Sequence, residues 1–77
     1  MLPEIGARLV RFRTQAGLDP EAAANATNVG VERLIGAEVG EVALDEDELG
    51  RLSRAYGIDP TELFGGRITP LQNYAGG

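Results

Sequence analysis

Four hydroxyl side chains are the candidate nucleophiles of this 77-residue chain, and the sequence offers no base to activate them. Histidine and cysteine are both absent, which removes imidazole and thiolate chemistry. The hydroxyl groups belong to Thr27, Ser53, Tyr56 and Tyr74. Because a nucleophile or an acid–base pair needs a partner in a pocket, we expect a protein that is not an enzyme and uses no cofactor.

The acidic run at residues 45–48 is the candidate for a metal site, since carboxylates are the ligands of hard cations. Its consecutive acids lack the alternating spacing of a calcium-binding loop. A helix start explains the run without a metal. Asp45 is placed to cap a helix, and the helix dipole favours negative charge in the first turn. We therefore expect no bound metal.

All seven basic residues are arginines, and they stand against twelve acidic residues, so the formal net charge is −5. Proteins that bind nucleic acid usually carry a basic excess, because their cations displace the counterions condensed on phosphates. This chain has the opposite balance. We further expect Arg51 and Arg54 to pair with Asp47 and Glu48 at helical spacing, which leaves few cations for a nucleic acid.

Apolar residues recur at helical spacing along the chain, and no strand pattern is present. Asp19-Pro20 and Asp59-Pro60 each place a capping carboxylate before a proline, which is typical of the first turn of a helix. The segment Asn28-Val29-Gly30 predicts a tight turn, because asparagine and glycine tolerate unusual backbone angles and the valine would fill the corner. The predicted helices cover residues 2–16, 20–27, 31–38, 46–56 and 60–64.

The length allows one domain and is too short for two. We assign residues 2–64 to a helical domain and residues 65–77 to a polar tail that docks on it or is disordered. Four apolar residues near this end are the candidates for self-association, namely Ile58, Phe64, Leu71 and Tyr74.

The first ten residues include Glu4 and Arg8, which excludes a signal peptide or a membrane span in this stretch. We therefore expect a cytoplasmic protein with no membrane partner.

Apolar, glycine and charged positions keep a regular order and spacing over the five predicted helices. They are Ile5-Gly6-Ala7-Arg8-Leu9, Arg13, Ala16-Gly17-Leu18, Ala24, Val29, Leu34, Glu38, Gly40, Leu49, Leu52, Tyr56-Gly57-Ile58-Asp59-Pro60 and Leu63. This order resembles the Cro and phage-repressor family, also called XRE-type helix-turn-helix domains. The resemblance implies an all-α, compact five-helix bundle with the architecture of the lambda-repressor DNA-binding domain, in which the third helix is presented to a major groove.

Arg13 and Glu38 form the predicted structural ion pair. Arg13 lies beside the apolar stripe of the first helix, and Glu38 lies one turn beyond Leu34 on the inward face of the third. Because an isolated buried charge is very costly, a bidentate pair between the two is the natural arrangement. Family members resemble this chain in tying the first helix to the end of the third.

By this resemblance, the residues that read base edges lie at the start of the third helix. Arg33 suits guanine, Val31 suits a thymine methyl group, and Glu32 accepts from cytosine. Gly36 lies one turn further on, and Arg11 on the first helix adds a cation. The resemblance thus implies a transcriptional regulator whose partner is double-stranded DNA. The other interpretation is that these are ordinary solvent-facing positions of a short helix.

At two positions that contact phosphate in the family, this chain carries a different type of residue. Pro20 stands where family members commonly carry glutamine, and it offers neither a side-chain nor a backbone donor. Glu41 opens a segment that is typically basic. These changes favour the alternative function, a degenerate helix-turn-helix that acts as a protein-interaction or dimerisation module, with a second copy or another protein as its partner.

Overall fold

Four α-helices and one 3₁₀ turn follow one another in the computed structural model, which describes residues 3–64. The five-helix expectation is therefore wrong for the last element. It has only five residues and begins at a proline, and such short pieces adopt the tighter 3₁₀ geometry. The elements are α1 (Pro3–Gln15), α2 (Pro20–Thr27), α3 (Val31–Glu38), α4 (Glu46–Tyr56) and the 3₁₀ turn η1 (Pro60–Phe64).

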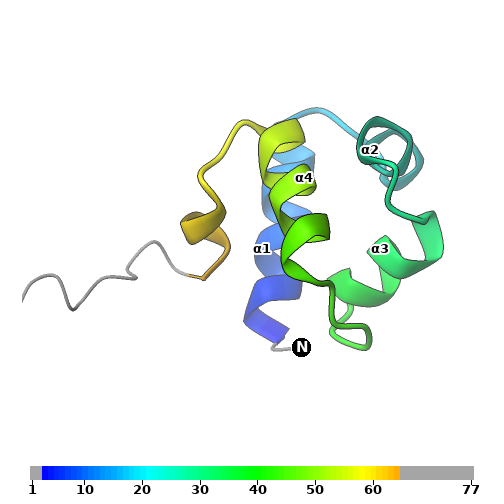
Figure 1. The fold of residues 1–77 in the computed structure, drawn as a ribbon, viewed down its shortest axis with the longest axis vertical. Helices are drawn as coiled ribbons and strands as arrows, with labels where there is room; N and C mark the ends of the chain where they lie inside the picture. The colour runs from blue at the N-terminus through cyan, green and yellow to red at the C-terminus, as the bar shows by residue number, and fades with distance from the viewer. Residues whose placement is uncertain (1–2, 65–77) are drawn as a thin grey trace, which may run out of the picture.

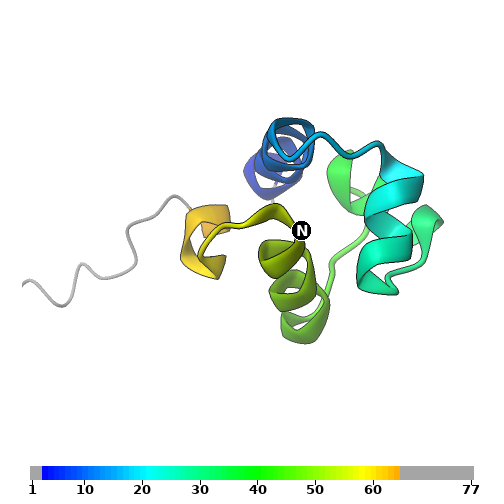
Figure 2. The same ribbon diagram turned by 90° about the horizontal axis from the view of Figure 1, so that it is seen from above.

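The two longest helices, α1 and α4, lie at the centre of the molecule (Figure 1). The α2–α3 pair lies on one side of them and η1 on the other, and the view from above shows the same order (Figure 2). This arrangement keeps α2 and α3 together as a unit at one end of the domain. The predicted tail, which includes Leu71 and Tyr74, lies outside the described residues.

One apolar core joins the elements. Its four fully buried leucines come from four different elements, α1, α3, α4 and η1. They are Leu9, Leu34, Leu52 and Leu63. Full burial of a leucine side chain stabilises a fold by roughly 1.5–3 kcal/mol, so this cluster fixes the position of α3 against the longer helices.

The predicted caps form at both ends of α2. The Asp19 carboxylate accepts a hydrogen bond from the backbone N–H of Ala22 at 2.8 Å, and Pro20 occupies the first turn. Asn28 ends the helix in the left-handed conformation, with φ 59°. Val29 is buried in the turn, as expected, while Gly30 has an ordinary φ of −59°. The turn therefore depends on the asparagine rather than on the glycine.

The close approach of α1 to the end of α3 depends on Gly6. A Cβ atom at this position would lie 2.5 Å from the carbonyl oxygen of Glu38 and 2.7 Å from that of Ala37. No real side chain tolerates such contacts with backbone atoms, so only glycine lets the two helices pack at this distance. The resulting contact holds the end of α3 against α1.

Candidate nucleic-acid interface

The outward face of α3 is the surface that a helix-turn-helix fold offers to a partner. Leu34 and Ala37 point into the core, and Val31 is half-buried. Glu32 is exposed on the opposite side, with Ile35 45% exposed and Val39, which caps the helix, 63% exposed. Besides the exposed Arg33, the surface thus presents one carboxylate and two aliphatic side chains.

Gly36 lies under the loop that follows α3. Its carbonyl oxygen accepts hydrogen bonds from the backbone N–H groups of Glu41 at 2.8 Å and Val42 at 3.1 Å. A side chain at Gly36 would collide with the Val42 side chain, so this loop covers the glycine. Gly36 therefore fixes the loop and adds no side chain of its own to the face.

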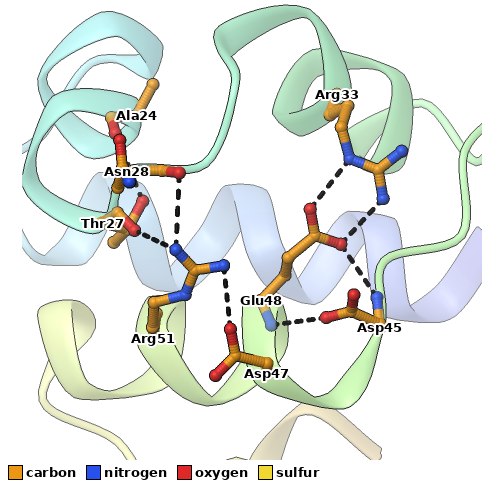
Figure 3. Close-up of polar contacts among 8 residues, drawn as sticks. All are labelled: Ala24, Thr27, Asn28, Arg33, Asp45, Asp47, Glu48 and Arg51. Carbon is orange, nitrogen blue, oxygen red and sulfur yellow. Dashed lines mark hydrogen bonds and ion pairs between the residues drawn. The ribbon is translucent and has the colours of Figure 1, made fainter.

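Arg33, the predicted guanine reader, is held in a bidentate ion pair (Figure 3). Its Nε donates to Oε2 of Glu48 at 2.8 Å, and its Nη2 donates to Oε1 at 2.7 Å. The Arg33 side chain is 49% exposed, whereas that of Glu48 is 11% exposed. The guanidinium is therefore anchored on one edge and open to solvent on the rest.

Glu48 is itself fixed by the start of α4. Its Oε1 accepts from the backbone N–H of Asp45 at 2.9 Å, and the Asp45 carboxylate accepts from the Glu48 N–H at 2.8 Å, a reciprocal capping box. The hydrogen bond from Arg33 and then that from the Asp45 backbone lower the pKa of Glu48 to about 2 from the usual 4.5. The same hydrogen bond raises the pKa of Arg33. The pair is thus fully charged at neutral pH.

Arg51 joins α4 to the end of α2. It donates to the carbonyl oxygens of Thr27 at 3.0 Å and Asn28 at 3.4 Å, where the helix dipole favours a cation, and it pairs with Asp47 at 3.0 Å (Figure 3). The expected pairing with Asp47 is confirmed. Glu48 instead pairs with Arg33, and Arg54 is exposed and forms no ion pair within residues 3–64.

The start of α2 lacks the hydrogen-bond donors that would bind phosphate. Pro20 has no N–H, and the N–H of Ala22 already donates to Asp19. Glu41 is exposed after α3. On α1, Arg11 is exposed and lies over the ring of Phe12, 4.9 Å from its centroid. The cations near the outward face are therefore few.

The Arg13–Glu38 pair is present as expected, with Nε 2.7 Å from Oε2 and Nη2 3.2 Å from Oε1. Arg13 also donates to the carbonyl oxygen of Leu18 at 3.0 Å. Both side chains are mostly buried, and the hydrogen bond to Glu38 raises the pKa of Arg13. The pair ties α1 to the end of α3 and lies away from the outward face.

The three candidate hydroxyl groups among the described residues are bound within helices or buried. Thr27 donates to the carbonyl oxygen of Ala23, and Ser53 donates to that of Leu49. The Tyr56 hydroxyl is buried without a hydrogen-bond partner, and its burial, with the nearby Glu38 charge, raises its pKa to about 12. Residues 3–64 contain no group of three or more acids that could hold a metal.

Of the residues predicted to support self-association, two are described. Ile58 packs against the core, and Phe64, at the end of η1, is 52% exposed. Leu71 and Tyr74 lie outside the described residues, so the cluster as a whole stays a prediction.

The Arg33–Glu48 pair was not predicted, because fifteen residues separate its members in sequence. The one available signal was Asp45 followed three residues later by Glu48, the capping-box spacing that turns the glutamate back toward the helix start. That spacing places the Glu48 carboxylate but does not reveal which cation reaches it.

A family model described as a helix-turn-helix domain matches residues 4–63. The chain therefore belongs to the helix-turn-helix domain family, in which α2 and α3 form the unit that gives the family its name. No curated protein and no solved structure matches the chain. In the part of the chain that the structure describes, no helix has the length and apolar character needed to cross a membrane.

Proposed function

We propose that this protein is a transcriptional regulator of the Cro and phage-repressor type that binds duplex DNA by placing α3 in the major groove. The observation that carries the proposal is the exposed outward face of α3, a helix that the buried Leu34 and the Gly6 contact hold against the rest of the domain. Membership of the helix-turn-helix family supports the same function at the general level.

The chemistry of this face predicts what it reads. Val31 and Ile35 suit the methyl groups of thymine, and the Glu32 carboxylate accepts a hydrogen bond from the N4 amino group of cytosine. Arg33 adds a donor pair for guanine or for phosphate. We therefore expect a site that contains thymines next to a C·G pair.

The charge of the domain predicts a weak dependence of binding on salt. Arg11 and Arg33 are the exposed arginines that the family resemblance places next to DNA phosphates. Pro20 and Glu41, at two positions that contact phosphate in the family, contribute no positive charge. Each neutralised phosphate contributes a slope of about −0.9 to log K against log salt, so two contacts give about −2. Specific affinity must then come mainly from base contacts.

A selection from random duplex DNA tests the proposal. The full chain is incubated with the library at about 50 mM salt, where electrostatic binding is strongest, and bound duplexes are sequenced. The expected result is one enriched motif, with weaker binding by Arg33→Ala. Arg54→Ala is the matched control, because it removes an exposed arginine from α4 that forms no ion pair within residues 3–64. No enrichment and no measurable affinity at this salt would contradict the proposal.

The second candidate function is a protein-interaction or dimerisation module, and the exposed aliphatic pair Ile35 and Val39 favours it. Exposed neighbouring apolar side chains mark protein interfaces, and the adjacent Glu32 repels phosphate. Sedimentation equilibrium of the full chain tests the dimer. This candidate predicts a concentration-dependent dimer that the double variant Ile35→Ser, Val39→Ser converts to a monomer. A monomer at all concentrations would leave no support for self-association.

A further inference from the structure

The guanidinium of Arg33 keeps one edge available while the other is bound. Arginine carries five N–H donors in a planar fork. Glu48 occupies Nε and one hydrogen of Nη2. Nη1 makes no hydrogen bond within residues 3–64, and it points away from the Glu48 carboxylate (Figure 3). The Nη1–Nη2 edge thus retains two parallel donors that face away from the ion pair.

The support beneath this edge is rigid. Glu48 accepts from both Arg33 and the Asp45 backbone, and only 11% of its side chain is exposed. Arg33 belongs to α3, whose Leu34 is fully buried in the core. A flexible arginine loses conformational entropy when it binds, whereas one held in place beforehand loses less. The carboxylate therefore fixes the plane and direction of the guanidinium before any ligand arrives.

We propose that Glu48 is a positioning residue that presents the Nη1–Nη2 edge of Arg33 to a pair of hydrogen-bond acceptors on duplex DNA. The acceptor pair is either two oxygens of one phosphate or O6 and N7 of a guanine, since both match the spacing of the arginine fork. This inference rests on the proposed function. It gives an acidic residue beside the interface a role in recognition, although its charge opposes phosphate at long range.

A purely structural clamp between α3 and α4 makes a different prediction. In that case the loss of Glu48 would release the guanidinium and remove a negative charge, and both effects would strengthen DNA binding. In a positioning role, the loss of Glu48 weakens binding despite the more favourable charge. The sign of the change in affinity therefore separates the two roles.

The test compares Glu48→Gln with Glu46→Gln in the full chain. Both variants remove one negative charge from the first turn of α4, and glutamine at position 48 keeps an acceptor for the capping box. Glu46 is exposed and makes no ion pair within residues 3–64, so it is the matched control. The measurement is the Kd for the duplex selected at low salt, with a thermal melt of each variant to show that it is folded.

We expect Glu46→Gln to bind as tightly as the wild type or more tightly. Glu48→Gln should bind about tenfold more weakly, because a bidentate contact carries roughly 5- to 150-fold in affinity and a released guanidinium keeps only part of it. If Glu48→Gln is not folded, Glu48→Asp replaces it, since a carboxylate one methylene shorter keeps the charge but no longer holds the guanidinium in the same place. The same loss of about tenfold is expected for that variant.

Two modified duplexes identify the acceptor pair. One carries 7-deazaguanine in place of each guanine of the motif in turn, which removes N7, and the other carries single methylphosphonates, which remove a phosphate charge. The modification that lowers the affinity of the wild type but not the affinity of Glu48→Gln identifies the acceptor pair that Arg33 contacts. Equal affinities of Glu48→Gln and Glu46→Gln for the natural duplex would overturn the inference alone. A wild type that binds no duplex would overturn the proposed function and this inference with it.

Discussion

Replacing Arg13 with alanine should destabilise the fold strongly, because it leaves a buried carboxylate without its partner. The side chains of Arg13 and Glu38 are only 14% and 7% exposed. Arg13 donates two hydrogen bonds to this carboxylate and a third to the carbonyl oxygen of Leu18. Nothing in an alanine side chain replaces these donors, so the Glu38 charge stays in a poorly solvated position.

The size of the loss follows from the burial of the pair. Removing one partner of a buried ion pair costs about 3–5 kcal/mol, and the small remaining exposure of Arg13 lowers this to about 2–4 kcal/mol. A domain of this length has a total stability of only about 4–12 kcal/mol. Because 1 kcal/mol shifts Tm by about 4–8 °C in a domain of this size, the Tm should fall by roughly 8–32 °C.

Urea denaturation followed by circular dichroism measures this change, with Arg54→Ala as the matched control. Arg54 is exposed on α4 and forms no ion pair within residues 3–64, so its removal should change the stability by less than about 0.5 kcal/mol. The double variant Arg13→Met, Glu38→Leu should recover most of the loss, because two apolar side chains need no partner. If Arg13→Ala and Arg54→Ala lose the same stability, the reasoning about the buried pair is refuted.

Three further predictions use the same denaturation assay. Gly6→Ala should lose about 1–3 kcal/mol, because its Cβ would press on the backbone of α3. Gly50→Ala should gain about 0.5–1 kcal/mol, because its Cβ would meet only the end of the Arg54 side chain, with Nη1 4.0 Å away. Equal effects of the two substitutions on stability would contradict the close packing. Tyr56→Phe should be at least as stable as the wild type, since it removes a buried hydroxyl that has no partner, and a clear loss would reveal an unseen hydrogen bond. The lowered pKa of Glu48 means that its ionised form stabilises the fold above pH about 4.5 and that this stabilisation is lost as the pH falls toward about 2. The stability difference between the wild type and Glu48→Gln should shrink over that range, and a constant difference would contradict the coupling.

Local signals in the sequence predicted the helices well. Aspartate before proline marked the start of α2, asparagine marked its left-handed end, and Gly57 marked the end of α4. These features act within one turn of the chain, so spacing alone reveals them. The 3₁₀ geometry of η1 was missed, because a short helical turn of either kind carries the same proline and capping signals.

Contacts across the core were harder to predict. The Arg13–Glu38 pair could be predicted because both charges fall on the inward faces of their helices and each needs a partner of opposite charge. Arg33 gave no such signal, since an exposed arginine on α3 has many possible partners. Its partner depends on how closely the start of α4 approaches α3, and Val42 covering Gly36 is part of that approach. Tertiary packing of this kind does not follow from helical periodicity.

An amide chemical-shift titration of the full chain with the duplex selected at low salt tests the central claim most directly. If α3 reads DNA, the largest shifts should fall on the backbone amides of Glu32, Ile35 and Gly36 and on the Nε–H of Arg33, with small shifts around Phe64 on the other side of the domain. Shifts that are absent, or that are largest around Phe64, would contradict the assignment of the α3 face as the DNA-binding surface.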